Sequence, residues 1–312
     1  MTSASPEATS SMTKIIFFGT GPVAAASLDF LRSKYDIEFV VTKPRVAGFK
    51  GDTPVEDLAK VHNLPLHFVA MRYDLDELFN NKHFESEVGI VVDFGIIISK
   101  KVIDAFDKGI VNSHFSLLPR WRGADPISYT ILADDDKAGV SLMVIDEGLD
   151  TGKLITQKLI HPDPKETTGS LTTKLISLSN ELLGTYLPRY LVGEIVPKNQ
   201  PHPDRVTHSH KITKADSIID WSEPADIIER KIRAYQPWPQ SRTTLGNVEV
   251  IVTSGVVREK GLTTPGQLVR EKNRLFVGTG KGWLEITSLK PAGKKEMPIQ
   301  AFLAGYSDKI AS

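Results

Sequence analysis

Three side chains suited to acid–base chemistry follow two apolar segments near the middle of the chain. Asn112 and His114 come at the end of the first segment, 109–112, and Asp150 follows the second, 139–145. Because side chains alternate along a strand, Asn112 and His114 share one face if the strand continues through them. Strand ends are where an open α/β sheet presents its chemistry, so these residues indicate an acid–base site at a sheet edge.

The segment after His114 favours a binding role over a solvated turn. Ser116-Leu117-Leu118-Pro119 is apolar and is stiffened by proline, which suits the wall of a site for a flat ligand. Two simpler interpretations stay open, because His114 can be a structural residue and the two leucines can be core. Arg120 and Arg122 can hold an anionic ligand or lie on a solvated face.

Strands and helices alternate along the N-terminal half, which predicts an α/β fold with a mainly parallel sheet covered on both faces. The expected strands include Lys14–Phe18, Ile37–Val41 and Val88–Val92. Right-handed crossovers then gather Gly19, Phe94 and Asn112 along one sheet edge.

A glycine-rich turn after the first strand raises the alternative of a dinucleotide site. Gly19, Gly21 and Ala24 satisfy Gly-x-Gly-x-x-Ala. That site also needs an acidic residue near the end of the second strand, where this chain has Thr42-Lys43, with Glu38 at the strand's start. We therefore expect the glycines to serve close packing and disfavour an NAD-dependent oxidoreductase.

Length and composition indicate a two-domain globular protein. The chain has 312 residues, 40% of them hydrophobic, and no cysteine, which excludes disulfides and thiolate zinc sites. No apolar run reaches the length of a membrane span, so we expect a cytoplasmic protein. We expect a monomer.

The predicted organisation is a disordered leader (1–13), a catalytic domain (14–195), a linker (196–207) and a domain of short strands forming a small β-barrel (208–312).

The charge is uneven although the net charge is zero. Residues 205–312 carry 17 Lys and Arg against 11 Asp and Glu, whereas residues 1–204 carry 21 against 27. An excess of Lys and Arg can mark the half that meets a polyanion such as RNA. Ordinary surface variation explains it equally well.

Two ordered segments resemble the signature of the folate-dependent formyltransferases, and most of all that of the methionyl-tRNA formyltransferases. They are Asn112-x-His114-x-Ser-Leu-Leu-Pro-Arg-Trp-Arg-Gly123 and Asp146-x-Gly-Leu-Asp-Thr-Gly152. The similarity runs from about Lys14 to about Tyr306 and includes the segments 219–221, 233–239 and 290–295. It implies a Rossmann-like catalytic domain and a C-terminal OB-like β-barrel that helps bind tRNA. The implied reaction, which requires no metal, moves the formyl group of 10-formyltetrahydrofolate to the α-amine of initiator methionyl-tRNA for translation initiation.

The resemblance also implies roles for individual residues. Asn112 and His114 would donate hydrogen bonds to the oxyanion that forms on the formyl oxygen, and Asp150 would accept the proton of the amine. The residues expected to contact the folate are Phe94, Gly95, Ser116, Leu117, Leu118, Pro119, Asp146, Glu147 and Gly148. The residues expected to contact tRNA are Arg45, Lys50, Lys211, Arg233, Lys294 and Lys295.

Two features depart from the family pattern. Asp93 stands in the turn where the family commonly has Ala or Ser, and the loop from Lys43 to Pro54 is shorter and less basic than the family's tRNA-gripping loop. The closest rival is a sugar-nucleotide N-formyltransferase, against which the full-length basic C-terminal half argues. Formyltetrahydrofolate hydrolase domains share the motif, but the basic C-terminal features fit them less well. A non-enzymatic RNA-binding protein would leave the three motif residues without a role.

Overall fold

The computed structural model describes residues 12–45, 51–259 and 264–310. The chain forms two compact units, and each takes its residues from separate parts of the chain. The first unit comprises 1–119, 139–158 and 175–206, and the second comprises 120–138, 159–174 and 207–312. Segments 120–138 and 159–174 thus group with C-terminal residues, whereas the predicted domain boundaries at 195 and 208 stay a prediction. The leader lies outside the described residues as far as residue 11.

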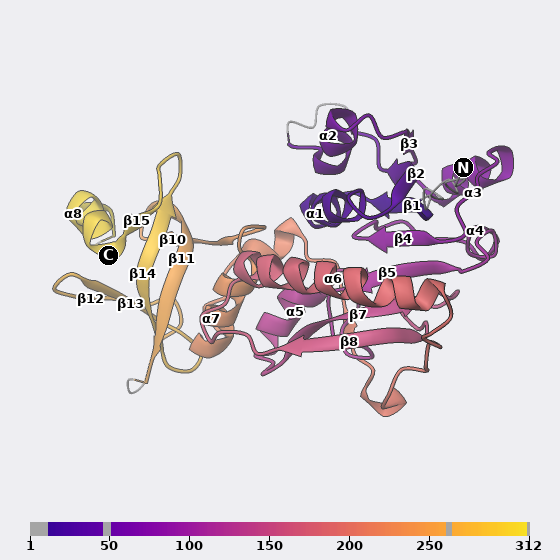
Figure 1. The fold of residues 1–312 in the computed structure, drawn as a ribbon. Helices are drawn as coiled ribbons and strands as arrows, with labels where there is room; N and C mark the ends of the chain where they lie inside the picture. The colour runs from indigo at the N-terminus through magenta and orange to yellow at the C-terminus, as the bar shows by residue number, and fades with distance from the viewer. Residues whose placement is uncertain (1–11, 46–50, 260–263, 311–312) are drawn as a thin grey trace, which may run out of the picture. The chain divides into compact units, whose positions relative to one another are not determined.

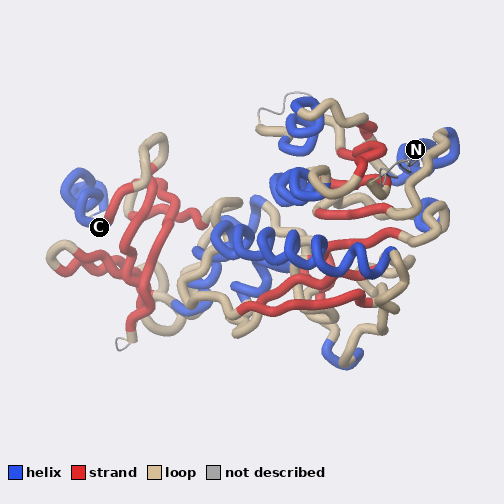
Figure 2. The backbone as a smooth tube through the Cα atoms, viewed as in Figure 1, coloured by secondary structure: helices blue, strands red, loops and turns tan. Residues whose placement is uncertain are grey.

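The first unit is built on a seven-stranded sheet of order β3-β2-β1-β4-β5-β7-β8 (Figures 1 and 2). Its strands are β1 (Lys14–Gly19), β2 (Asp36–Thr42), β3 (Leu66–Phe68), β4 (Gly89–Val92), β5 (Ile110–His114), β7 (Ala138–Val144) and β8 (Leu154–Ile160). Neighbouring strands from β3 to β5 are parallel, and β7 is antiparallel to β5. The predicted mainly parallel sheet is confirmed, with a reversal at β7.

Helices connect the parallel strands of this sheet. They are α1 (Pro22–Leu31), α2 (Pro54–Val61), α3 (Arg72–Asn81) and the short α4 (Lys100–Ile103). The long helix α6 (Thr168–Leu191) continues through Pro188, so the proline does not end the helix where the sequence allowed it to. None of the described helices has both the length and the apolar character needed to cross a bilayer.

The ends of three parallel strands lie in register, as predicted. Gly19 pairs with Val92, and Val91 pairs with Asn112. A Cβ atom on Gly19 would lie 2.5 Å from the Cβ of Ala24 and 2.8 Å from the carbonyl oxygen of Val92. Only glycine fits at this approach of turn, helix and strand, so its role in close packing is confirmed.

Glu38, the acidic residue of β2, has a structural role. Its carboxylate accepts hydrogen bonds from the backbone N–H groups of Glu85 and Ser86 and from the Ser86 hydroxyl, at 2.6–3.0 Å. The acid therefore anchors the segment that leads into β4. This agrees with the expectation that the strand lacks a ribose ligand.

The second unit contains a six-stranded antiparallel sheet of order β10-β11-β14-β13-β12, with β15 added to β14. Its strands are β10 (Ser241–Leu245), β11 (Val248–Arg258), β12 (Leu268–Glu271), β13 (Arg274–Gly278), β14 (Trp283–Pro291) and β15 (Met297–Pro298). Strands β11 to β14 overlap the four segments that the sequence predicts as strands between glycine turns, 248–254, 266–271, 274–278 and 283–289. The sequence did not predict β10 or the C-terminal helix α8 (Ile299–Ile310).

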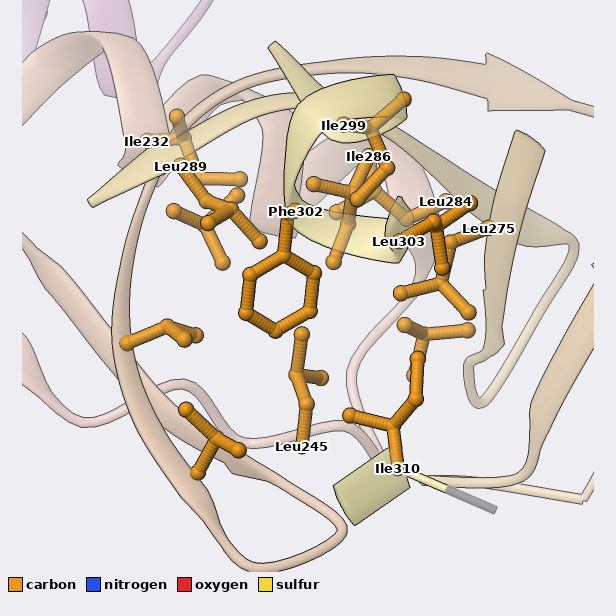
Figure 3. Packing of buried hydrophobic residues seen from close by; sticks show 14 of the residues in the cluster. Ile232, Leu245, Leu275, Leu284, Ile286, Leu289, Ile299, Phe302, Leu303 and Ile310 are labelled. Atoms are coloured by element: carbon orange, nitrogen blue, oxygen red, sulfur yellow. The ribbon is translucent and has the colours of Figure 1, made fainter. Parts of the chain in front are cut away.

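The core of the antiparallel sheet is filled from the sheet and from helices. Figure 3 shows Phe302 of α8 among Ile286, Leu289 and Leu245, with Ile232 of α7 (Ala225–Ala234) in the same cluster. The second unit also contains α5 (Pro126–Leu132), a 3-10 turn (Lys214–Ser217) and a parallel pair of short strands, β6 (Arg122–Gly123) and β9 (His208–Ser209). Another 3-10 turn, Pro203–Arg205, belongs to the first unit.

A carboxylate on this sheet is held between two arginines. Arg274 donates two hydrogen bonds of 2.6 Å to Glu285, and Nε of Arg258 donates a third of 2.7 Å. The Glu285 side chain is only 10% exposed. The Arg274 hydrogen bonds, assisted by Arg258 and opposed by burial, lower the pKa of Glu285 from 4.5 to about 2.

We expect this cluster to stabilise the sheet in a pH-dependent way. Because the folded-state pKa of Glu285 lies below its unfolded value, the stabilisation is complete above pH 4.5 and is lost as the pH falls toward 2. Glu285→Gln should lower the free energy of unfolding by about 2 kcal/mol at neutral pH and by less in acid, as measured by urea denaturation. Glu249→Gln, on an exposed position of β11, is the control. An equal loss of unfolding free energy for Glu285→Gln at neutral pH and in acid would contradict a stabilising role of the ionised carboxylate.

Candidate active site

Strand β5 carries two of the three motif side chains. The strand continues through His114, so Asn112 and His114 lie on one face as predicted. Ser113 faces the other way, and its hydroxyl lies 2.7 Å from the hydroxyl of Ser179 on α6. Helix α6 thus packs on the face opposite the motif residues.

Asp150 reaches His114 by an indirect route. Val144 at the end of β7 pairs with Val111 near the start of β5, so the loop 145–153 leaves the sheet away from His114. Yet Oδ2 of Asp150 lies 3.7 Å from Nδ1 of His114, and the side chains are only 12% and 7% exposed. This separation exceeds the length of a hydrogen bond.

The loop that carries Asp150 is internally braced. Oδ1 of Asp146 accepts hydrogen bonds from the Gly148 backbone N–H at 3.1 Å and from the Thr151 hydroxyl at 2.5 Å. A Cβ on Gly152 would lie 1.8 Å from the carbonyl oxygen of Val144, so the returning loop packs on the end of β7. The carboxylate of Asp146, which we expected to face the folate, shapes this turn, while Glu147 and Gly148 are exposed.

The predicted folate segment is fixed through its backbone. The Ser141 hydroxyl donates to the carbonyl of Ser116 at 2.6 Å and accepts from the N–H of Leu118 at 3.1 Å. Gln157 donates from Nε2 to the carbonyl of Leu118 at 2.8 Å and to the Ser141 hydroxyl at 2.7 Å. These bonds hold the segment Ser116–Pro119 rigidly beside the end of β5.

Two predicted folate contacts have core side chains. Leu118 is 2% exposed and packs with Met143 and Leu154. Phe94 is 3% exposed and packs edge-to-face on Phe18, with 5.6 Å between the ring centroids. Their side chains fill the core, which is the simpler interpretation that the sequence left open for Leu118. Contacts from these positions to a ligand would have to come from the backbone, as they would from the exposed Gly95.

Asp93, the departure from the family turn, has a left-handed backbone with φ of 49° and is exposed. A Cβ on Gly21 would lie 2.5 Å from its Oδ2, so the carboxylate lies against the glycine turn after β1.

The predicted tRNA contacts divide into exposed and engaged groups. Arg45, Lys211, Lys294 and Lys295 are exposed, although Arg45 also donates to the carbonyl of Gly51 at 3.2 Å, and Lys50 lies outside the described residues. The Arg233 side chain is 12% exposed and donates to Glu229 and to the carbonyl of Glu166 at 2.8–3.0 Å. These contacts argue against a phosphate contact by Arg233.

Arg120 is also engaged internally. It makes two hydrogen bonds of 2.6 and 2.7 Å to the carboxylate of Asp135, and its guanidinium lies 4.2 Å from the ring centroid of Trp121. The structure therefore favours a structural role for Arg120 over either role that the sequence left open.

Sequence reasoning missed the polar residues that brace the site. Ser141 lies opposite His114 in the antiparallel pairing of β5 with β7, and Gln157 lies on β8. No local motif marks a serine or a glutamine in such strands, because their partners are backbone groups distant in sequence. In the part of the chain that the structure describes, no group of three or more His, Cys, Asp or Glu residues is arranged to hold a metal ion.

Comparison with known proteins gives two family matches and full-length relatives. Residues 13–187 match the formyl transferase family, and residues 211–307 match the formyl transferase C-terminal domain. The chain is 37% identical over 306 residues to methionyl-tRNA formyltransferase of Pseudoalteromonas translucida, covering 95% of each chain. It is 36% identical over 299 residues to the enzyme of the same name from Halorhodospira halophila, covering 94% of this chain and 96% of the relative.

Solved structures share the fold. WlaRD, a sugar 3N-formyl transferase, has a TM-score of 0.68 at 20% identity, covering 91% of this chain and 99% of that one. HypX from Aquifex aeolicus, in complex with tetrahydrofolic acid, has a TM-score of 0.63 at 14% identity, covering 95% of this chain and 48% of that one.

Ser141→Ala tests the bracing of the folate segment. The change leaves the buried N–H of Leu118 and the carbonyl of Ser116 with one partner fewer, so the free energy of unfolding should fall by about 1–3 kcal/mol. Urea denaturation measures the loss. Ser254→Ala, on an exposed pair in the antiparallel sheet, is the control and should cost less than about 0.5 kcal/mol. Equal stability of the two variants would show that the Ser141 bonds contribute little.

Proposed function

The chain belongs to the formyl transferase family, among the methionyl-tRNA formyltransferases, and from that premise we propose that it transfers the formyl group of 10-formyltetrahydrofolate to the α-amine of initiator methionyl-tRNA. It is an enzyme that formylates methionyl-tRNA with a folate co-substrate. The observation that supports the proposal most strongly is the 3.7 Å approach of Asp150 to His114, beside Asn112, within a chain that matches its relatives over 95% of its length.

The fold fits a folate at the edge formed by β1, β4 and β5. The bracing by Ser141 and Gln157 presents the backbone of Ser116–Pro119 as a rigid wall. Glu147 and Gly148 are exposed on the neighbouring loop of the same unit. We propose that these segments bind the folate through backbone groups and apolar surface, a composition that is usual in ligand sites.

The proposed chemistry uses three groups of this chain. As the methionyl amine attacks the formyl carbon, negative charge develops on the formyl oxygen. Asn112 and an N–H of His114 donate hydrogen bonds to it, and each such donor is worth about 3 kcal/mol in related oxyanion sites. Asp150 accepts the proton of the amine, directly or through water, and its carboxylate lies 3.7 Å from Nδ1 of His114. The collapse that follows breaks the bond between the formyl carbon and the folate nitrogen, which takes up the proton that Asp150 accepted and leaves as tetrahydrofolate.

We assign tRNA phosphate contacts to the exposed basic residues of the predicted set, Arg45, Lys211, Lys294 and Lys295. Arg233 is left out because its guanidinium is internally engaged. The proposed setting is the cytoplasm, where a monomer would meet charged tRNA.

The direct test is formyl transfer from 10-formyltetrahydrofolate. We expect formyl-methionyl-tRNA as the product when charged initiator tRNA is the acceptor, and no product with an amino-sugar nucleotide or with buffer alone. Chromatography detects the formylated acceptor, and the release of tetrahydrofolate is measured in the same reactions. Transfer to the sugar nucleotide would be consistent with the proposed catalytic residues but would contradict the proposed acceptor. Release of formate alone would indicate a hydrolase.

His114→Ala separates catalysis from tRNA binding. Loss of one oxyanion donor should lower kcat by about 100- to 1,000-fold, while the Kd for charged tRNA changes less than about twofold. Single-turnover kinetics and filter binding measure these quantities. His83→Ala, at an exposed position, is the matched control. Transfer near the wild-type rate in His114→Ala would refute the proposed mechanism.

A further inference from the structure

The position of Asp150 depends on more than its own loop. Its φ is 51°, in the left-handed region that a residue with a side chain seldom adopts without external support. The bonds made by Asp146 hold Gly148 and Thr151, which lie on either side of Asp150, and Gly152 fixes the return of the loop to β7. These bonds end on the Gly148 N–H and the Thr151 hydroxyl, so the backbone carbonyl of Asp150 is held by a different contact.

Gln200 makes that contact from a different part of the chain. Its side-chain amide nitrogen donates to the carbonyl of Asp150 at 2.7 Å and to the carbonyl of Gly152 at 3.0 Å. One amide group thus joins the residue that carries the carboxylate to the glycine that anchors the loop. Both bonds are partly buried, which strengthens them relative to bonds in open water.

The segment that carries Gln200 is itself fixed to the sheet. Lys198 and Leu154 exchange two backbone hydrogen bonds of 2.7 and 2.9 Å, so the chain at 198 lies as an added partner beside the start of β8. The sequence predicted 196–207 to be a linker, but its first part is therefore held within the first unit. Two residues after this anchor, the amide of Gln200 has little freedom to move.

We propose that Gln200 is a positioning residue, which holds the Asp150 carboxylate where it meets His114 and the incoming amine. The proposal rests on the proposed function, in which Asp150 accepts the amine proton. Without the Gln200 amide, the backbone of Asp150 can relax out of the left-handed region and carry the carboxylate away from Nδ1 of His114, now 3.7 Å distant. A displacement of about 1 Å is enough to lower a rate by up to about 100-fold.

The test compares Gln200→Met, which keeps the side-chain length and removes the donors, with Asn199→Ala, the exposed neighbour. Gln200→Met should lower kcat by about tenfold and change the KM for the formyl-folate and for charged tRNA by less than about twofold. Asn199→Ala should keep the wild-type kcat. Gln200→Glu, isosteric but unable to donate, should resemble Gln200→Met, and thermal unfolding of each variant identifies any loss of folded protein.

A double-mutant cycle shows whether the effect passes through Asp150. Asp150→Asn removes the proton acceptor but keeps the backbone carbonyl, so Gln200→Met should cause no further loss of kcat in that background. If Asp150→Asn retains the wild-type rate, the proposed mechanism fails. If Asp150→Asn is slow but Gln200→Met and Gln200→Glu keep the wild-type kcat, or if Gln200→Met lowers kcat equally in both backgrounds, the positioning role is overturned and the mechanism stands.

Discussion

Strand β7 runs antiparallel to β5, so the loop after it leaves the sheet near Val111, at the start of β5 and not beside His114. To place Asp150 at 3.7 Å from His114, the chain must turn back on itself and stay there. The features of loop 145–153 follow from this demand. Gly152 allows the close return to Val144, and Asp150 takes a left-handed backbone conformation. A catalytic carboxylate on a returning loop has a defined position only if other elements hold the loop.

Polar side chains that hydrogen-bond to backbone groups fix the loops around the candidate site. Ser141 and Gln157 fix the segment after His114, and Gln200 fixes the loop of Asp150. Each bond contributes about 1 kcal/mol to stability, but together they order two loops that would otherwise sample many conformations. Such bonds suit a transferase that must align an amine and a formyl carbon, because pre-ordered groups reorganise little as charge develops.

The basic residues differ in whether they bond to groups of their own unit or are exposed to solvent. Arg120, Arg233 and Arg274 bind carboxylates or carbonyl groups of their own unit, whereas Lys211, Lys294 and Lys295 are exposed. Arginine presents a planar fork that suits fixed internal partners, whereas lysine is a flexible, well-hydrated charge. The number of Lys and Arg residues in the C-terminal half therefore overstates how many are available to contact RNA.

The sequence by itself determined the mainly parallel sheet, the shared face of Asn112 and His114, and the family, because alternation and an ordered motif are local patterns. It predicted strands β11 to β14 but not β10 or α8, whose patterns are short or overridden by packing. Only the tertiary structure decided the roles of Ser141, Gln157 and Gln200, and the burial of Phe94 and Leu118. These depend on partners that are distant in sequence, such as Gln200 and Asp150, which are 50 residues apart, and no local pattern encodes such a pairing.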